Sequence, residues 1–156
     1  MTFDLARFRT AARSLKPREA VVPVPDLAHW FEEGAAAEWT VRGLTGVEIA
    51  TANEASSRVK LYAATVEALA SAAHSDQADA LKSLMGANGE PPEDLAKRFD
   101  QLTFCSVNPA ISREDAILLF ATYPIVAYQL SNKIIELTGL GPDLGKAQNS
   151  TDAPMS

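Results

Sequence analysis

The longest regular pattern in the chain is a stripe of apolar residues between positions 46 and 73. Its members recur at alternating steps of four and three residues, and they are Ala55, Val59, Tyr62, Val66, Leu69 and Ala73. This spacing keeps the side chains on one face of an α-helix. The stripe follows Thr45 and Glu48, which have the spacing of a capping box. We therefore expect one continuous helix over 46–73, with its stripe buried against the 93–104 or the 124–138 segment.

Further helices are predicted in the second half of the chain. Their signals are capping residues, acidic first turns and prolines at the start, and glycine or proline at the end. The predicted helices cover 76–86, 93–104, a segment from Ser112, and a last segment that Pro124 starts or kinks. Asn108-Pro109 is expected to end the 93–104 helix. Gly139 is expected to follow the last helix as its C′ glycine.

The N-terminal part has a different character. Residues 3–15 have roughly helical spacing and predict a short amphipathic helix that Pro17 stops. Residues 21–25 are β-branched and proline-rich, and 39–44 alternate large apolar with polar residues. These two runs predict paired extended segments, joined by a longer loop or helical turn. An isolated hairpin is marginal in water, so this one must pack on helices or on a partner.

These patterns together predict a mainly α fold: a compact helical domain of about five helices with a small N-terminal β-hairpin or extended section. We expect an N-terminal helix over 1–18, the extended or hairpin section over 19–44, the helical domain over 45–140 and a disordered C-terminal tail over 141–156. The tail has no periodicity and little apolar content. No repeat of fixed period is found in the sequence, which argues against a solenoid.

Charge and composition narrow the class of function. The chain has 156 residues, 47% of them hydrophobic and 22% charged, so one globular domain is expected. Its net charge of -6 argues against nucleic-acid binding, which needs clustered Lys and Arg. The loose basic group from Arg7 to Arg18 is interpreted as a solvated helix face. The sequence shows neither the apolar core of a signal peptide nor a membrane-spanning run. We therefore expect a cytoplasmic protein that binds neither nucleic acid nor membrane.

Residues that could carry chemistry are few and scattered. His29 and His74 have no partner at a zinc-ligand spacing, and the single cysteine, Cys105, fits a buried structural thiol. The sequence contains no phosphate-binding loop, nucleophile elbow or dinucleotide fingerprint. We expect no catalytic, cofactor-binding or metal-binding residues, and no enzyme activity. An enzyme site assembled from the dispersed residues His29, Glu33 and Arg42 is the weakest alternative.

Aromatic residues are the better candidates for recognition. Trp30 and Trp39 lie in the proline-containing N-terminal section, which is a weak fold by itself but a suitable docking edge. Trp and Tyr are favoured anchors of protein interfaces. The predicted partner-binding residues are Trp30, Phe31, Trp39, Val41 and Arg42. Core packing is the competing interpretation of the same aromatic residues.

The order of these segments is also informative. The extended run leads to Val41-Arg42-Gly43-Leu44-Thr45-Gly46-Val47-Glu48, which looks like a V-R-x-L-T-G-x-E entry to a helical domain. An alanine-rich helix follows, then the block from Asn108 to Ala116, and then a Tyr123-Pro124 helix that closes on Leu137-Thr138-Gly139-Leu140. Over residues 20–141 the chain thus resembles the tail assembly chaperones of long-tailed bacteriophages and prophages. Residues 1–18 match nothing in that family.

The resemblance implies a protein-binding function in tail morphogenesis. It implies that the chain binds the tape measure protein and recruits tail tube (major tail) subunits in the bacterial host cytoplasm, and that it is absent from the mature virion. Many genes of this family carry a programmed −1 frameshift near their end. Leu144-Gly145-Lys146 can be encoded as CTG-GGA-AAG, which contains a slippery string. A frameshifted longer form of the chain is therefore a further implied partner.

A different class of function fits the same residues. The chain could be a bacterial helical adaptor or regulatory protein that acts by protein–protein binding, with an oligomer formed through the 55–73 stripe. Neighbouring genes distinguish the two hypotheses. A major tail protein gene upstream and a very long tape measure gene downstream would support the chaperone.

Overall fold

The computed structural model describes residues 2–86 and 89–144 and is mostly helical, with one small antiparallel sheet. The helices are α1 (Leu5–Ala12), the 3-10 helix η1 (Pro25–Trp30), α2 (Gly46–Asn53), α3 (Ala55–Ala72), α4 (Ser75–Lys82), α5 (Glu93–Cys105), α6 (Arg113–Thr122) and α7 (Pro124–Leu140). The strands are β1 (Glu19–Pro23), β2 (Glu38–Arg42) and β3 (Ser106–Asn108). The predicted mainly α fold is confirmed, and the predicted N-terminal hairpin is part of a small three-stranded sheet.

The sheet has the strand order β1-β2-β3, and both pairs are antiparallel. Strands β1 and β2 form the predicted hairpin, in register from Glu19 opposite Arg42 to Pro23 opposite Glu38. The connection between them contains η1, in agreement with the predicted longer loop or helical turn. Strand β3 was not predicted, because it is three residues long and has no pattern of its own. The chain enters it directly from α5, so Asn108-Pro109, whose peptide bond is cis, ends a strand and not a helix.

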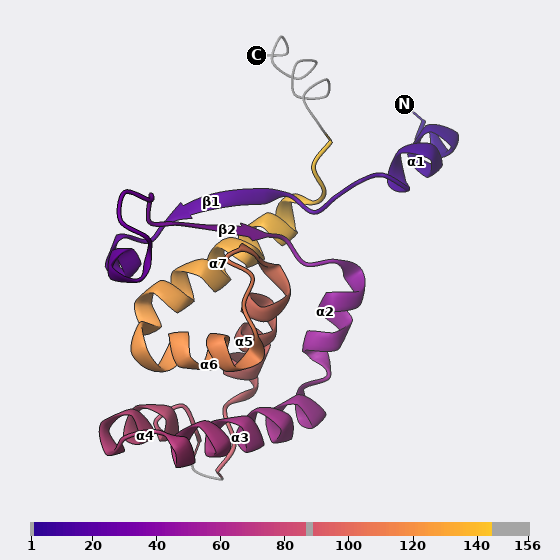
Figure 1. Ribbon diagram of the computed structural model, residues 1–156. Coiled ribbons are helices and arrows are strands. Elements are labelled where there is room, and N and C mark those ends of the chain that lie inside the picture. Colours follow the sequence, from indigo (N-terminus) through magenta and orange to yellow (C-terminus); the bar gives the residue numbers. More distant parts are fainter. Residues whose placement is uncertain (1, 87–88, 145–156) are drawn as a thin grey trace.

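The continuous helix predicted over 46–73 is wrong, because the chain breaks at Glu54 into α2 and α3. Glu54 has φ −77° and ψ 62°, outside the α region. The predicted capping box at the start of α2 is present: the Thr45 hydroxyl accepts from the Glu48 amide, and the Glu48 carboxylate accepts from the Thr45 amide. The break lets α2 contact α5 while α3 contacts α4, α5 and α6 (Figure 1). The described residues of 45–140 therefore form six α-helices, one more than predicted.

The predicted burial of the α3 stripe is confirmed at Val59, Tyr62 and Val66, and the helix packs against α5, one of the two predicted partners. Leu69 is only half-buried. The side chain of Ala55 lies outside the described part of the structure.

One apolar core joins the sheet to the helices. Val24 and Leu27 around η1, and Val41 of β2, belong to the same cluster as the inner faces of α3 to α7. At its centre the rings of Tyr62, Phe99 and Phe120 follow one another, with centroids 4.8 and 5.4 Å apart. The sections predicted as 19–44 and 45–140 thus share one core.

The ends of α4 and α7 differ from the predicted ends. Helix α4 ends at Lys82, earlier than the expected position 86. Helix α7 continues through Gly139 to Leu140, and Gly141, with φ 78°, follows it instead. Gly141 has the positive φ that terminates a helix at low steric cost, whereas Gly139 keeps helical geometry. Helices α6 and α7 are separate, and α7 begins at Pro124.

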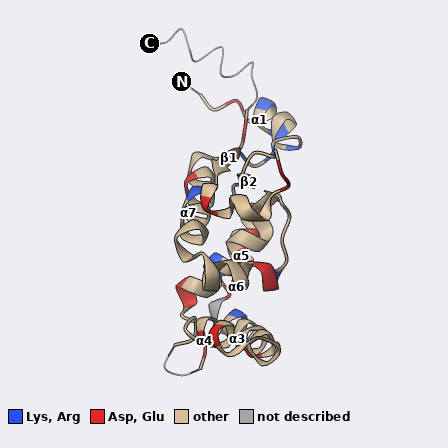
Figure 2. Cartoon of the chain, turned by 60° about the vertical axis from the view of Figure 1, so that its left-hand side comes forward, with Lys and Arg blue, Asp and Glu red and all other residues tan. Residues whose placement is uncertain are grey.

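Helix α1 stands apart from the core. Asp4 caps it, because its carboxylate accepts from the Arg7 amide at 3.0 Å, and the helix ends at Ala12, well before Pro17. None of its residues is buried. Figures 1 and 2 show α1 projecting beyond the sheet, at the opposite end of the molecule from α3 and α4.

The described start of the predicted tail lies against the segment that precedes β1. The Asp143 amide donates to the Lys16 carbonyl at 2.9 Å, and the Arg18 guanidinium donates to the Pro142 carbonyl at 3.5 Å. Residues 145–156, which include Gly145 and Lys146 of the predicted slippery site, lie outside the described part.

Candidate protein-binding groove

An open groove of about 1250 Å³ lies beside the start of β2. One wall is the end of η1 and the loop that returns to β2, and the opposite wall is formed by Pro109, Ile111 and the outer face of α6. The beginning of β2 and the end of β3 lie between the two walls. In Figure 1 η1 and its loop lie at the left, beyond the tip of β1.

The lining of this groove is mainly apolar. Its apolar side chains, which together are called the floor of the groove, include Leu27, Trp30, Phe31, Trp39, Pro109, Ile111, Leu118, Leu119 and Tyr123. Trp30 is 69% exposed, although its indole N–H donates to the Tyr123 hydroxyl at 3.0 Å. This bond connects the two walls and fixes the orientation of a large exposed ring. An exposed, oriented tryptophan beside apolar surface is typical of a protein-binding anchor.

The groove is also acidic. Glu32, Glu38 and Asp115 line it, and none of the described lining residues is Lys or Arg. Asp115 is held in place by the α6 cap, where its carboxylate accepts from the Ser112 amide at 3.0 Å. Carboxylates around an apolar floor attract a cationic partner and raise its rate of encounter. The geometry therefore suits a segment that has both apolar and basic side chains.

Local sequence explains the floor of the groove. Strand β2 alternates exposed and buried positions, so Trp39 and Val41 point to the same, inner face. The indole N–H of Trp39 donates to the Ser106 hydroxyl at 3.1 Å, which satisfies its polar atom inside the core. This bond also joins β2 to β3 across the sheet.

The structure brings three of the five predicted partner-binding residues together. Trp30, Phe31 and Trp39 all line the groove, but Trp39 is only 7% exposed and forms part of the core. Val41 is fully buried and does not line the groove. Arg42 does not line it either. The prediction that Trp39 and Val41 offer a contact surface is therefore corrected, since alternation along β2 turns both inward. The Arg42 side chain is 23% exposed outside the groove, and its predicted role in partner binding stays a prediction.

Arg42 has a structural role at the far end of β2. Its guanidinium forms an ion pair with Glu48 at 2.7 Å and donates to the Phe104 carbonyl at 2.7 Å, which ties the sheet to α2 and α5. The hydrogen bond from Arg42 lowers the pKa of Glu48 below its usual range, and burial opposes this shift. The same bond raises the pKa of Arg42.

The α6 wall of the groove was missed by sequence reasoning. No local signal indicates that Leu118, Leu119 and Tyr123 stand opposite η1. A long-range pairing, that of β2 with β3, creates this juxtaposition. Only the aromatic composition of residues 30–39 pointed to this region.

The residues of the alternative enzyme site do not converge. His29 and Glu33 are exposed on η1 and the loop after it, whereas Arg42 is engaged with Glu48 at the other end of β2. Burial raises the pKa of the Cys105 thiol to about 12, with Arg42 offsetting part of the effect, so the thiol stays protonated at neutral pH.

No cluster of three or more His, Cys, Asp or Glu side chains is arranged to hold a metal ion in the described part of the chain. No described helix combines the length and apolar character needed to cross a membrane. Comparison of the chain with models of protein families, with curated proteins and with solved structures finds no significant match in any of the three.

Proposed function

We propose that this chain is a non-catalytic tail assembly chaperone that binds the tape measure protein of a long-tailed phage or prophage and recruits tail tube subunits during tail morphogenesis. It acts in the cytoplasm of the bacterial host and is absent from the mature virion. The order of sequence segments over 20–141 supports this proposal. The observation that carries it is the groove, with its apolar floor and acidic rim.

The size of the groove favours a polypeptide over a small ligand. Small-molecule pockets are typically about 300–1,000 Å³ and enclose most of their ligand. The groove is larger, at about 1250 Å³, and is open to solvent. An amphipathic helix can place its apolar side chains on such a floor while its basic side chains meet the carboxylate rim. A long helical client such as a tape measure protein offers segments of this kind.

Co-expression with the tape measure protein encoded beside this chain tests the proposal. We expect the two proteins to be recovered together in a pull-down. Trp30→Ala should weaken the complex by about 2 kcal/mol, or roughly thirtyfold in Kd, if Trp30 is an interface anchor. Val47→Ala is the matched control, because Val47 is 78% exposed on α2 and does not line the groove.

Either of two outcomes would refute the proposal. If the wild-type chain fails to retain a soluble, co-expressed tape measure protein, the proposed function is refuted. If Trp30→Ala and Val47→Ala lose binding equally, the groove is not the binding site. A pull-down that instead retains a host regulatory protein, with no tail genes adjacent, would support the adaptor alternative.

The longer form of the chain is a separate part of the proposal. A slip at Leu144-Gly145-Lys146 would append new sequence beyond α7, where it would not disturb the core. The gene sequence gives the first test: the string CTG-GGA-AAG must be present, and the −1 frame must stay open. Mass spectrometry of the expressed protein should then show a minor product that diverges after Lys146.

A further inference from the structure

Helix α1 has an apolar face that is exposed within the described part of the structure, residues 2–86 and 89–144. Phe3, Leu5 and Phe8 are 70%, 47% and 49% exposed, and the rings of Phe3 and Phe8 touch with centroids 5.4 Å apart. Leu5, Phe8 and Ala12 follow one another at helical spacing, so their side chains form one stripe. A helix of this length is marginal in water without a surface to pack on. Helix α1 therefore has the properties of a segment that docks elsewhere.

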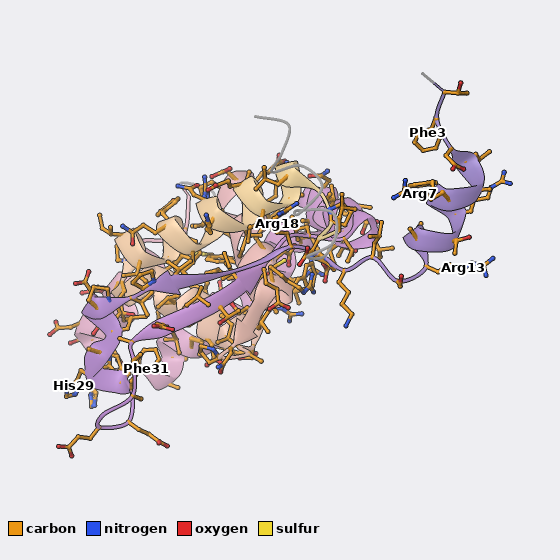
Figure 3. All side chains as sticks on the ribbon, turned by 90° about the horizontal axis from the view of Figure 1, so that it is seen from above. Phe3, Arg7, Arg13, Arg18, His29 and Phe31 are labelled. Carbon is orange, nitrogen blue, oxygen red and sulfur yellow. The ribbon has the colours of Figure 1, made fainter. Side chains whose placement is uncertain are left out.

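The remaining surface of this arm is basic. Arg7 and Arg9 lie in α1, and Arg13 caps its end. Figure 2 shows basic residues on α1, and in Figure 3 Arg13 is directed away from the body, whereas Arg7 extends from the side of α1 that faces it. The arm is thus a cationic amphipathic helix, the kind of segment that the groove is suited to bind.

We propose that α1 of a second copy of this chain occupies the groove. Its apolar stripe lies on the groove floor beside Trp30, and its arginines face Glu32, Glu38 and Asp115. The arm and the groove are complementary in charge and in apolar character, and both are exposed in the single chain. Each copy offers one arm and one groove, so the contact is heterologous: the arm of one copy binds the groove of another. Repetition of this contact links the chains into oligomers.

The position of α1 explains why the groove of its own chain is not the acceptor. The root of the arm is held at Lys16 by the backbone bond from Asp143. From there β1 runs about 16 Å toward η1 and the groove, at the usual rise per residue of a strand. The linker Arg13–Leu15 spans at most about 10 Å and leads the other way. Figure 3 shows α1 at one end of the molecule, with His29 and Phe31 at the opposite end.

Occupation of the groove by an arm would regulate the chaperone, and this part of the inference rests on the proposed function. The arm of a neighbouring copy would cover the apolar floor while no client is present. A client segment would have to displace it, because both bind the same surface. Self-association and client binding would then be mutually exclusive at each groove.

Sedimentation velocity of the full chain across a wide concentration range tests the contact. We expect wild-type protein to change from monomer to oligomer as its concentration rises. Phe8→Glu changes only an exposed arm residue, and the double variant Glu32→Lys/Glu38→Lys changes only exposed rim residues. Each should shift the association midpoint by about tenfold or more. Val47→Glu introduces the same charge as Phe8→Glu at an exposed position outside the arm and groove, and it should associate like the wild type.

Mixing the two variants provides a sharper test. Phe8→Glu keeps an intact groove, and Glu32→Lys/Glu38→Lys keeps an intact arm. One arm and one groove remain available, so the mixture should form a heterodimer that neither variant forms alone. A wild-type chain that stays monomeric at every concentration would overturn the inference, as would a Phe8→Glu chain that associates like the wild type. A mixture that contains only monomers would also overturn it.

The pull-down with the tape measure protein separates this inference from the proposed function. If the arm competes with the client, Phe8→Glu should capture more client than the wild type at equal concentration. Unchanged capture by a monomeric Phe8→Glu chain would refute the regulatory step and leave the proposed function standing. Arm-dependent association without client capture by any form would refute the proposed function and leave the arm contact standing.

Discussion

Asp100 is a buried carboxylate that holds α3 against α5, and its replacement gives a sharp test of the core. Its side chain is 1% exposed and accepts from two groups of α3. The Arg58 guanidinium donates at 2.5 and 3.1 Å, and the Tyr62 hydroxyl donates to the same carboxylate. Asp100→Asn keeps the volume but replaces one acceptor oxygen with a donor. One of the two donors is then left facing an N–H group.

The expected loss follows from the burial of the partners. Removing one member of a fully buried ion pair costs about 3–5 kcal/mol. The Arg58 side chain is 20% exposed and can recover some hydration, which places the expected loss for Asp100→Asn near the lower end, about 3 kcal/mol. Tyr62→Phe removes one hydrogen bond to the carboxylate and should cost about 1.5 kcal/mol, the lower end for a bond to a charged acceptor, because Arg58 still pairs with Asp100. The double variant should lose less than the sum, because both changes remove the same bond.

Urea unfolding at neutral pH, followed by far-UV circular dichroism, measures these losses. The slope of the free energy against urea should be equal in all variants, so that the midpoints report stability alone. A smaller loss for Asp100→Asn than for Tyr62→Phe would refute the reasoning, since it would mean that the carboxylate is not the centre of the network.

The remaining predictions concern the junction of the sheet with α2 and α7. Gly43→Ala should lose about 1–3 kcal/mol in urea unfolding, because a Cβ there would lie 3.0 Å from the Thr138 amide nitrogen, which is backbone of α7. Glu48→Gln should lose about 1 kcal/mol at pH 7, because the charge-assisted bonds from Arg42 are weakened. The folded-state pKa of Glu48 lies below its ordinary value of 4.5, so this stabilisation is fully present above pH 4.5 and disappears as the pH falls through the folded pKa.

Each of these predictions has an internal check. Gly46→Ala is the control for Gly43, since a Cβ at Gly46 meets nothing within 4 Å and should leave stability unchanged or slightly higher. Equal losses at the two glycines would contradict the close approach of β2 to α7. For Glu48→Gln, the difference from the wild type should shrink at acidic pH. A difference that grows as the pH falls would contradict the assigned ion pair.

Local sequence determined those helices and strands whose sequence signals lie within a few neighbouring residues. The capping box at Thr45 and Glu48 and the helix over 93–104 depend on neighbouring backbone and side-chain groups, and they were predicted correctly. Pro124 was expected either to start a helix or to kink one, and the structure shows that it starts α7. The hairpin of β1 and β2 was predicted for a similar reason, because its strands are close in sequence and show β-branched composition and alternation.

Only the tertiary structure decided where distant segments meet. No glycine or proline marks the break at Glu54 in the sequence. The break arises because α2 and α3 bury different surfaces. Strand β3 exists only as a partner of β2. Composition selected Trp30 and Trp39 equally, yet Trp30 is exposed beside a groove and Trp39 is in the core. Burial depends on which surfaces approach from far along the chain, and no local pattern contains that information.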